Sequence, residues 1–442
     1  MRTQRLLEAA KKPVPEGTYA IGAGLIIAGL TAYGFQIMAA RQLSPDEYGA
    51  LNGLWALVFV VTPGFFQPLE QEVSRALAHR RAKGFGGGPL VRRAAVLGGI
   101  LAGTVAVASL IAGPALVEHL FHGQAGLLLA LLIALGSYYL AHITRGTLSG
   151  NGRFGPYGTM MGSEGLVRFA MCVALFVTGV GTAGLYGLAL AIPPFFAIAI
   201  ALRGQRRLLL PGPEAPYSEL STALGWLLLG SVLAQTLSYA AFLGVVLLAE
   251  PGQQDEVGKF ITGLFVARIL ILLFQAVQAA LLPKLARLTG GGRHDDFRSG
   301  LLKLVLIVLG LAVIGVIGAA TLGPWAGQLL FGAENFVLGS TDLALLTGGS
   351  GAFILALTLA QGLIALRGYA PAAMAWIAGI VGFVAVTALG NDLFLRVELG
   401  FLCGSLLAAA VMGLLLLVRL RSGVPEELDQ LVEVIEHEPL EV

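Results

Sequence analysis

The chain has 442 residues, of which 56 % are hydrophobic and only 12 % are charged, and its mean hydropathy is +0.82. Soluble globular domains carry about 25 % charged residues, so this composition excludes a water-soluble protein and indicates a polytopic membrane protein. The 28 basic and 26 acidic residues nearly cancel, which gives no indication of a nucleic-acid partner. Cys172 and Cys403 lie in separate apolar runs and the histidines are scattered, so we expect no disulfide and no metal site.

The segment 1–16 contains four basic residues and two prolines but no hydrophobic stretch or cleavage site of its own. We expect a retained cytoplasmic tail rather than a signal peptide. Apolar runs that are each long enough to cross a bilayer follow this tail, and they number about 12. They fall at 17–40, 49–74, 94–118, 124–144, 156–179 and 182–202, and again at 221–249, 258–283, 299–321, 342–366, 370–390 and 397–418.

The segment 203–220 contains three arginines and three prolines, a composition typical of a linker. It divides the chain into an N-lobe at 17–202 and a C-lobe at 221–420, with an acidic cytoplasmic tail at 421–442. The expected fold is therefore all-α, with about 12 transmembrane helices in two six-helix lobes.

The distribution of basic residues predicts the orientation of the chain. Of the 28 Lys and Arg residues, 23 fall in the tails and alternate connections on one face, three on the other face and two, Arg168 and Arg268, within spans. Because short cytoplasmic loops are enriched in Lys and Arg, we expect both termini to be cytoplasmic in a plasma membrane.

The two halves also carry a common motif at the start of their second spans. Asp46-Glu47-Tyr48-Gly49 recurs 209 residues later as Asp255-Glu256-Val257-Gly258. Such an internal repeat is typical of transporters built from two related lobes.

Two blocks of sequence resemble a known family. The segment 38–83 is similar to the first hairpin of the polysaccharide-export flippases, in the superfamily that also contains multidrug and toxin extrusion antiporters and peptidoglycan-precursor flippases. The second block is 144–170, with Arg145-Gly146, a Gly-x-Gly-Arg-Phe motif and Glu164-Gly165-x-x-Arg168. The resemblance implies two lobes around a central cavity lined by spans 1, 2, 7 and 8, alternating access, and a lipid-linked sugar as substrate.

Arg268 is the sharpest single feature of the sequence, because it lies near the middle of the eighth run. A charge at that depth costs about 2.5 to 3.5 kcal/mol and usually faces a cavity or a partner. With Gln275 and Gln278 it forms a polar arc on an otherwise apolar helix. We expect these three residues to bind substrate, with the guanidinium able to hold a pyrophosphate in two parallel hydrogen bonds. The alternative is a structural ion pair with a carboxylate of another helix.

Glu164 and Arg168 lie four residues apart in the fifth run, the acid before the base. This order favours a pair on one helix face, so the two readings are a structural pair and a site for ligand binding or proton coupling. Gln67 in the second span and Gln235 in the seventh lie in polar stripes of helices that the resemblance places at the cavity. Amide side chains suit sugar hydroxyl groups, but they also form hydrogen bonds between membrane helices.

The leading hypothesis is a flippase that moves a lipid-linked oligosaccharide or polysaccharide precursor across the cytoplasmic membrane, in contact with membrane lipids and with glycosyltransferase or polymerase components. The alternatives are an ion-coupled multidrug antiporter of the same superfamily, with H⁺ or Na⁺ as coupling ion, and a non-transporting scaffold of a polysaccharide assembly complex. An enzyme such as a glycosyltransferase is disfavoured, because the only sizeable outer loop expected, 322–341, contains a single acidic residue, Glu334. No cofactor is expected.

Overall fold

The computed structural model describes residues 18–220, 224–250, 252–271, 274 and 294–422. Within these residues every regular element is a helix and none is a strand, which confirms the expected all-α fold. Ten helices are long and apolar enough to cross a membrane, or eleven when the bent pair α10 and α11 counts as one span. The eighth expected span, 258–283, lies partly outside the described residues.

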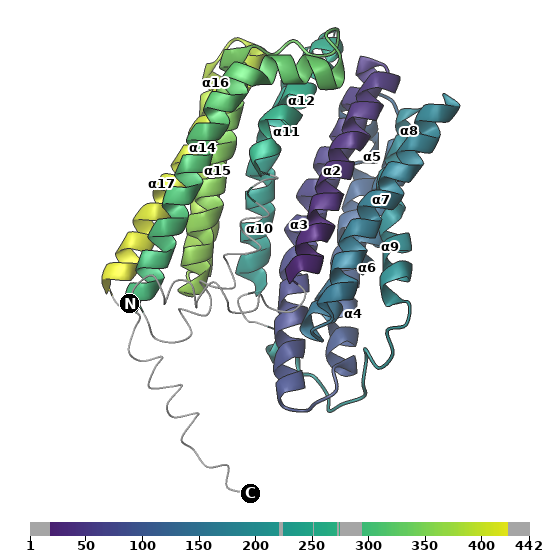
Figure 1. Cartoon of the computed structure of the whole chain (residues 1–442), viewed down its shortest axis with the longest axis vertical. Helices are drawn as coiled ribbons and strands as arrows, with labels where there is room; N and C mark the ends of the chain where they lie inside the picture. The colour runs from purple at the N-terminus through teal and green to yellow at the C-terminus, as the bar shows by residue number, and fades with distance from the viewer. Residues whose placement is uncertain (1–17, 221–223, 251, 272–273, 275–293, 423–442) are drawn as a thin grey trace, which may run out of the picture.

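The first bundle is formed by the helices before the linker (purple to blue in Figure 1). They are α2 (Thr18–Gln42), α3 (Pro45–Ala82), α4 (Gly88–Ile111), α5 (Gly113–Ala115), the π-helix η1 (Leu116–Leu120), α6 (Ala125–Gly150), α7 (Phe154–Thr178), α8 (Ala183–Ala191) and α9 (Pro193–Leu202). Helix α2 packs on α7, and α3 packs on α6. The break between α8 and α9 occurs at a proline pair, Pro193 and Pro194, because proline cannot continue the hydrogen-bond ladder.

The second bundle lies beside the first (teal to yellow in Figure 1). After the short η2 (Tyr217–Glu219) come α10 (Leu224–Ser238), α11 (Ala240–Leu248), α12 (Gln254–Ala267), α14 (His294–Phe331), α15 (Ser340–Ala365), α16 (Tyr369–Leu389) and α17 (Leu393–Ser422). Helix α17 packs on both α15 and α16. Helix α2 begins and α17 ends at the same end of the molecule (lower in Figure 1).

Helix α3 is longer than a membrane span needs. Ser44 caps it, with the Glu47 amide donating to the serine hydroxyl and the Glu47 carboxylate accepting from the Ser44 amide, the reciprocal pattern of a capping box. Its 38 residues span about 57 Å at 1.5 Å per residue, against about 30 Å of hydrocarbon. The last turns of α3 therefore lie beyond the apolar core of the bilayer.

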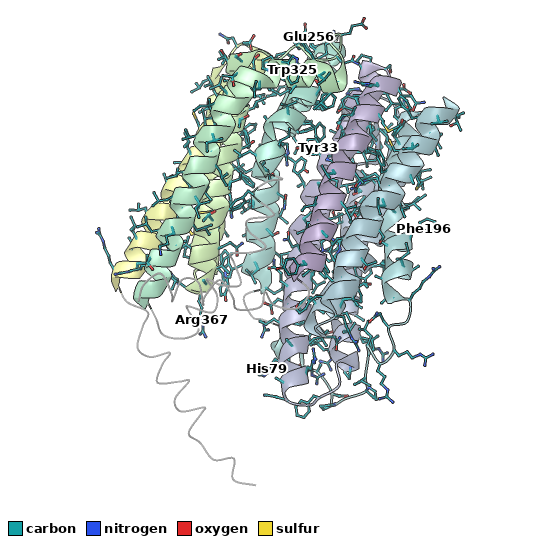
Figure 2. The ribbon with its side chains drawn as sticks, viewed as in Figure 1. Tyr33, His79, Phe196, Glu256, Trp325 and Arg367 are labelled. Atoms are coloured by element: carbon teal, nitrogen blue, oxygen red, sulfur yellow. The ribbon has the colours of Figure 1, made fainter. Side chains whose placement is uncertain are left out.

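The bundles meet at the end where α2 stops and α3 starts (upper in Figure 1). The Arg41 guanidinium donates from Nε to the Leu330 carbonyl at 3.1 Å and from Nη2 to the Leu329 carbonyl at 3.0 Å. The Asn335 amide donates to the Ala40 carbonyl at 3.4 Å. Helix α14 contains Pro324, and Trp325 lies at this same end of the molecule (Figure 2). These contacts join the bundles through neutral backbone carbonyls rather than through ion pairs.

Two expectations about connections are corrected by the structure. The outer loop expected at 322–341 is mostly helical, because α14 continues to Phe331 and α15 begins at Ser340. Arg145, counted with a connection in the charge distribution, lies inside α6 and is only 7 % exposed. In both cases the helix extends past the end of the apolar run, since helix length follows backbone hydrogen bonding and not hydropathy alone.

The segment 203–220 lies against the first bundle. Its Leu210 carbonyl accepts from the Gly88 amide at 2.9 Å, and Arg80 donates to the carbonyls of Pro213 and Glu214 at 2.7 and 3.1 Å. Arg80 also pairs with the Glu219 carboxylate at 3.2 Å. The segment is therefore anchored along the ends of α3 and α4.

Candidate functional site

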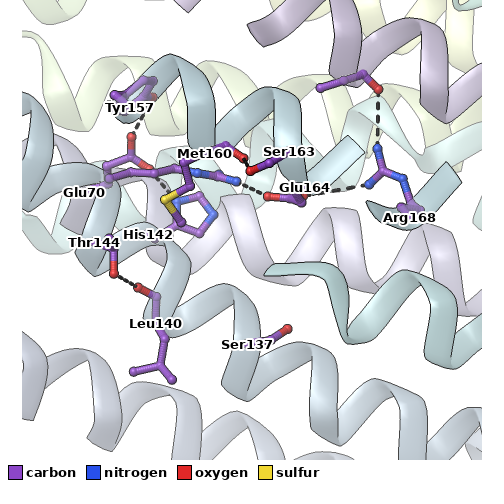
Figure 3. A network of polar contacts seen from close by, with 12 residues as sticks. Glu70, Ser137, Leu140, His142, Thr144, Tyr157, Met160, Ser163, Glu164 and Arg168 are labelled. Atoms are coloured by element: carbon purple, nitrogen blue, oxygen red, sulfur yellow. Dashed lines mark hydrogen bonds and ion pairs between the residues drawn. The ribbon is translucent and has the colours of Figure 1, made fainter. Parts of the chain in front are cut away.

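A buried ion-pair cluster lies inside the first bundle (Figure 3). The Arg145 guanidinium of α6 pairs directly with the Glu164 carboxylate of α7, and Arg168 Nη1 lies 3.8 Å from the other carboxylate oxygen of Glu164. The three residues are 7 %, 7 % and 4 % exposed, respectively. The predicted pairing of Glu164 with Arg168 is present, but the closer partner of Glu164 is Arg145.

The cluster continues toward α3. Glu70 accepts a hydrogen bond from the Tyr157 hydroxyl at 2.9 Å and lies 2.7 Å from His142 Nδ1 (Figure 3). Arg75, five residues after Glu70 on the same helix, pairs with Glu72 at 2.8 Å and not with Glu70. Glu70 therefore points into the bundle and belongs to the buried cluster.

The charges of this cluster compensate one another. Two arginines face two carboxylates, and Arg168 also donates to the Ala28 carbonyl of α2 at 3.4 Å. Its guanidinium carbon lies 5.8 Å from the Trp55 ring of α3, a distance that allows a cation–π contact. The cluster thereby connects α2, α3, α6 and α7. Buried charges are tolerated when they are paired and hydrogen-bonded in this way, and the geometry favours the structural reading of Glu164 and Arg168.

Arg268 lies at a break between two helices of the second bundle. It directly follows Ala267, the last residue of α12. Its Nη1 donates to the Ser238 carbonyl at 2.6 Å and its Nη2 donates to the Ser238 hydroxyl at 3.1 Å. Its guanidinium carbon also lies 4.0 Å from the centre of the Tyr239 ring.

The contact with Ser238 explains a bend that the sequence did not indicate. Helices α10 and α11 are separated at Tyr239 by a 58° bend, although no proline or glycine is present there. In an unbroken helix the Ser238 carbonyl would accept from the backbone amide four residues later. Arg268 supplies a charged donor to this carbonyl instead, which is a recognised cause of a kink.

The environment of Arg268 is the surface between the bundles. One turn before it, the Phe265 carbonyl accepts a hydrogen bond from the Tyr33 hydroxyl of α2 at 3.1 Å. The Phe265 ring packs on the Trp55 ring of α3 at 6.1 Å, and Figure 2 shows Tyr33 between the two bundles. Arg268 is half-buried, and none of the described carboxylates forms an ion pair with it. The expected alternative of a structural ion pair therefore finds no partner in the described part of the chain.

The remaining predicted residues lie in different places. Gln67 is exposed on α3, one turn after Pro63, whose carbonyl accepts from the Ser231 hydroxyl of α10 at 3.2 Å. Gln235 is half-buried on α10, one turn after Ser231. Gln67 and Gln235 thus follow the contact between α3 and α10, whereas Glu164 and Arg168 lie inside the first bundle. Gln275 and Gln278 lie outside the described residues.

Sequence reasoning missed Glu398. This residue of α17 is 0 % exposed, and neither carboxylate oxygen has a hydrogen-bond partner among the described residues. The signal that could have identified it is that Glu398 is the single charged residue in the apolar run 397–418. No group of three or more His, Cys, Asp or Glu side chains in the described residues is arranged to hold a metal ion.

No protein-family model matches the chain. Two uncharacterized proteins of Mycobacterium tuberculosis are similar to it along most of its length. One is 24 % identical over 409 residues, covering 88 % of this chain and 90 % of that protein. The other is 25 % identical over 413 residues, covering 90 % of this chain and 91 % of that protein.

Solved structures of MATE transporters match the fold closely. A mutant of the Vibrio cholerae MATE transporter VcmN superposes with a TM-score of 0.70 at 18 % identity, covering 92 % of this chain and 96 % of that one. The outward-facing conformation of a multidrug resistance MATE family transporter of the MOP superfamily gives 0.70 at 16 % identity, covering 92 % and 95 %. The inward-facing conformation of such a transporter gives 0.69 at 18 % identity, covering 89 % and 95 %. The chain therefore has the fold of these MATE transporters, and its described residues include ten or eleven helices that could span a membrane.

Proposed function

We propose that this chain is a membrane transporter that moves a lipid-linked oligosaccharide or polysaccharide precursor across the cytoplasmic membrane by alternating access. The observation that carries the proposal is Arg268, a half-buried cation at the surface between the bundles that forms no ion pair with a described carboxylate. A charge in such a place marks a substrate path more often than a packing contact.

The chemistry of Arg268 suits a diphosphate linkage. Its contacts to Ser238 engage Nη1 and Nη2, each once, although a guanidinium carries five N–H donors in a planar fork. That fork matches two phosphate oxygens with parallel hydrogen bonds. The Tyr239 ring, 4.0 Å away, supports the cation without neutralising its charge.

The contacts between the bundles suit a motion of one lobe against the other. At the end where α2 stops and α3 starts, Arg41 donates two hydrogen bonds to backbone carbonyls and Asn335 donates one. Each is worth only about 0.5 to 1.5 kcal/mol, or somewhat more for the charged donor. Such contacts can exchange for water when the lobes separate. The fold is also similar to multidrug resistance MATE family transporters in outward-facing and inward-facing conformations.

The direct test is Arg268→Ala in a cell that depends on this protein for polysaccharide export. We expect export to fall about ten- to a hundredfold, since a hydrogen bond to a charged group contributes about 1.5 to 3 kcal/mol, and the lipid-linked precursor should accumulate on the inner leaflet. Arg268→Lys should restore only part of the export, because an ammonium group lacks the planar two-point geometry.

Arg92→Ala is the matched control, because Arg92 is an exposed arginine of α4 away from the surface between the bundles. Normal export by Arg268→Ala at the native protein level would refute the proposed role. Loss of the protein from the membrane would support a structural role instead.

Glu398 favours a second candidate function, an ion-coupled antiporter. A fully buried carboxyl group without a described partner is a position at which a proton or a cation can bind. In proteoliposomes, an imposed H⁺ or Na⁺ gradient should then drive efflux of a cationic dye, and Glu398→Gln should abolish the dependence on the gradient. Dye efflux that is absent in the wild-type protein would eliminate this candidate.

A further inference from the structure

A basic pocket lies at the end of the first bundle where the linker folds back on it, near the end that His79 marks in Figure 2. Its volume is about 390 Å³. It is lined by three arginines from three separate segments, Arg81 at the end of α3, Arg153 between α6 and α7, and Arg207 in the segment 203–220. The remaining walls are Leu77, Phe85, Gly86, Gly87, Asn151, Gly152, Leu208 and Leu210, which include no acidic residue.

The pocket is built by specific contacts rather than by chance proximity. Arg81 Nη1 donates to the Asn151 carbonyl at 2.6 Å, and the Asn151 side-chain amide donates to the Leu208 carbonyl at 3.3 Å. A Cβ atom at Gly152, whose φ is +70°, would lie 2.5 Å from the Arg81 guanidinium. The positive φ of Gly152 favours glycine at this turn, because a residue with a Cβ atom is strained in the left-handed region.

Arg207 has a positive φ angle, which is unfavourable for a residue other than glycine. Its φ of 60° lies in the left-handed region, which costs a residue with a side chain about 1 to 2 kcal/mol. The residues that follow anchor it on both sides of the pocket, because the Leu208 carbonyl accepts from Asn151 and the Leu210 carbonyl accepts from the Gly88 amide. The surrounding contacts thus hold Arg207 at the pocket against its own preference.

The three arginines of the pocket differ from Arg80 and Arg93 in forming no ion pair among the described residues. Arg80, next to Arg81, is buried and pairs with Glu219, and Arg93 lies 4.0 Å from Glu214. Arg81, Arg153 and Arg207 are exposed and form no ion pair within the described residues. The helix ends at the pocket add little net charge, because α3 and α6 end there while α4 and α7 begin there.

We propose that this pocket binds an anionic phosphate group, carried either by the headgroup of a membrane lipid or by a soluble phosphorylated compound. Three guanidinium groups around one cavity suit phosphate oxygens by both charge and hydrogen-bond geometry. The position of the pocket is compatible with a lipid headgroup as the carrier of the phosphate. The end of α3 lies just beyond the hydrocarbon core, and the exposed Phe85 and Leu210 flank the arginines. This site is separate from Arg268 and does not depend on the transported substrate.

The test uses the purified full-length chain in a neutral detergent, titrated separately with pyrophosphate, phosphatidylglycerol and, as the uncharged-headgroup control, phosphatidylcholine. Binding is measured by isothermal titration calorimetry for pyrophosphate and by native mass spectrometry for the lipids. We expect saturable binding of pyrophosphate, phosphatidylglycerol or both, which weakens at higher salt. Binding of phosphatidylglycerol alone identifies the lipid source, and binding of pyrophosphate alone identifies the soluble source.

Arg81→Gln/Arg153→Gln/Arg207→Gln should weaken binding at least about tenfold, a change of about 1.4 kcal/mol. The matched control is Arg92→Gln/Arg203→Gln/Arg206→Gln, which removes the same charge from exposed arginines that do not line the pocket and should leave binding within about twofold. Because Arg81 also holds Asn151, Arg153→Gln/Arg207→Gln provides a second variant if the triple variant does not fold. Absence of saturable binding to the wild-type chain, or an equal loss in the control, would overturn the proposal.

Discussion

The buried charged side chains of the two bundles differ in their described partners. In the first bundle, Arg145 and Arg168 face Glu164, and Glu70 is held by His142 and Tyr157. In the second bundle, the described partners of Arg268 are the neutral residues Ser238 and Tyr239, and the buried Glu398 has no described partner.

The difference separates charges that hold helices together from charges that remain able to bind. A compensated cluster has satisfied its strongest interactions within the protein, so a ligand gains little by approaching it. An uncompensated charge retains most of its attraction for an opposite charge, and low dielectric strengthens that attraction. This contrast supports the proposed division between a structural cluster in the first bundle and a binding site at the surface between the bundles.

The aromatic ring of Trp55 contacts both regions. Trp55 is 5.8 Å from the Arg168 guanidinium and 6.1 Å from the Phe265 ring, one turn before Arg268. The compensated cluster thus supports a side chain that packs at the surface between the bundles. A change in the cluster should reach the candidate binding surface only through this packing.

The largest effect on stability should come from Glu164→Ala. The substitution leaves Arg145 and Arg168 buried without their carboxylate, and breaking a buried pair costs about 3 to 5 kcal/mol. Folded protein recovered after detergent extraction should fall sharply, and the midpoint of thermal unfolding should fall with it. Glu118→Ala, which removes an exposed acid of η1, is the control and should change neither quantity.

A double variant sharpens this prediction. Adding Arg168→Met to Glu164→Ala removes one of the two uncompensated cations and should recover part of the lost stability. If Glu164→Ala is as stable as the wild type, the cluster does not hold the first bundle together and the comparison between the bundles fails.

A smaller effect is expected for Tyr157→Phe. It removes one hydrogen bond to the Glu70 carboxylate, at 2.9 Å, while keeping the ring, so the loss should be about 1.5 kcal/mol. The midpoint of thermal unfolding in detergent should fall measurably but less than for Glu164→Ala. Tyr217→Phe, on an exposed tyrosine of η2, is the matched control and should leave the midpoint unchanged.

The smallest effect on stability should come from Glu398→Gln. Because Glu398 has no described partner to lose, replacing it with a neutral amide should leave stability unchanged or raise it by up to about 1 kcal/mol. Thermal unfolding of the two proteins in the same detergent measures this directly. A loss comparable to that of Glu164→Ala would mean that Glu398 is a compensated structural charge after all.

Much of the fold followed from local sequence. The apolar runs predicted the helices in order, because each must satisfy its own backbone hydrogen bonds in lipid. The predicted ends of the helices were less accurate where a helix continues past the hydrocarbon core of the bilayer, as α3 and α14 do. The i, i+4 spacing also predicted the contact of Glu164 with Arg168, because helix geometry places these side chains on one face.

The sequence by itself therefore determined the all-α membrane fold, the approximate helix positions and the contacts within single helices. Tertiary structure decided which charges are compensated: Arg145 reaches Glu164 only because α6 and α7 lie side by side, and Arg268 reaches Ser238 only because the breaks in two helices meet. It also gathered Arg81, Arg153 and Arg207, which are up to 126 residues apart in the sequence, into one pocket. The physical reason is that hydropathy and helical periodicity act within one segment, whereas pairing of charges depends on distances between segments that only packing sets.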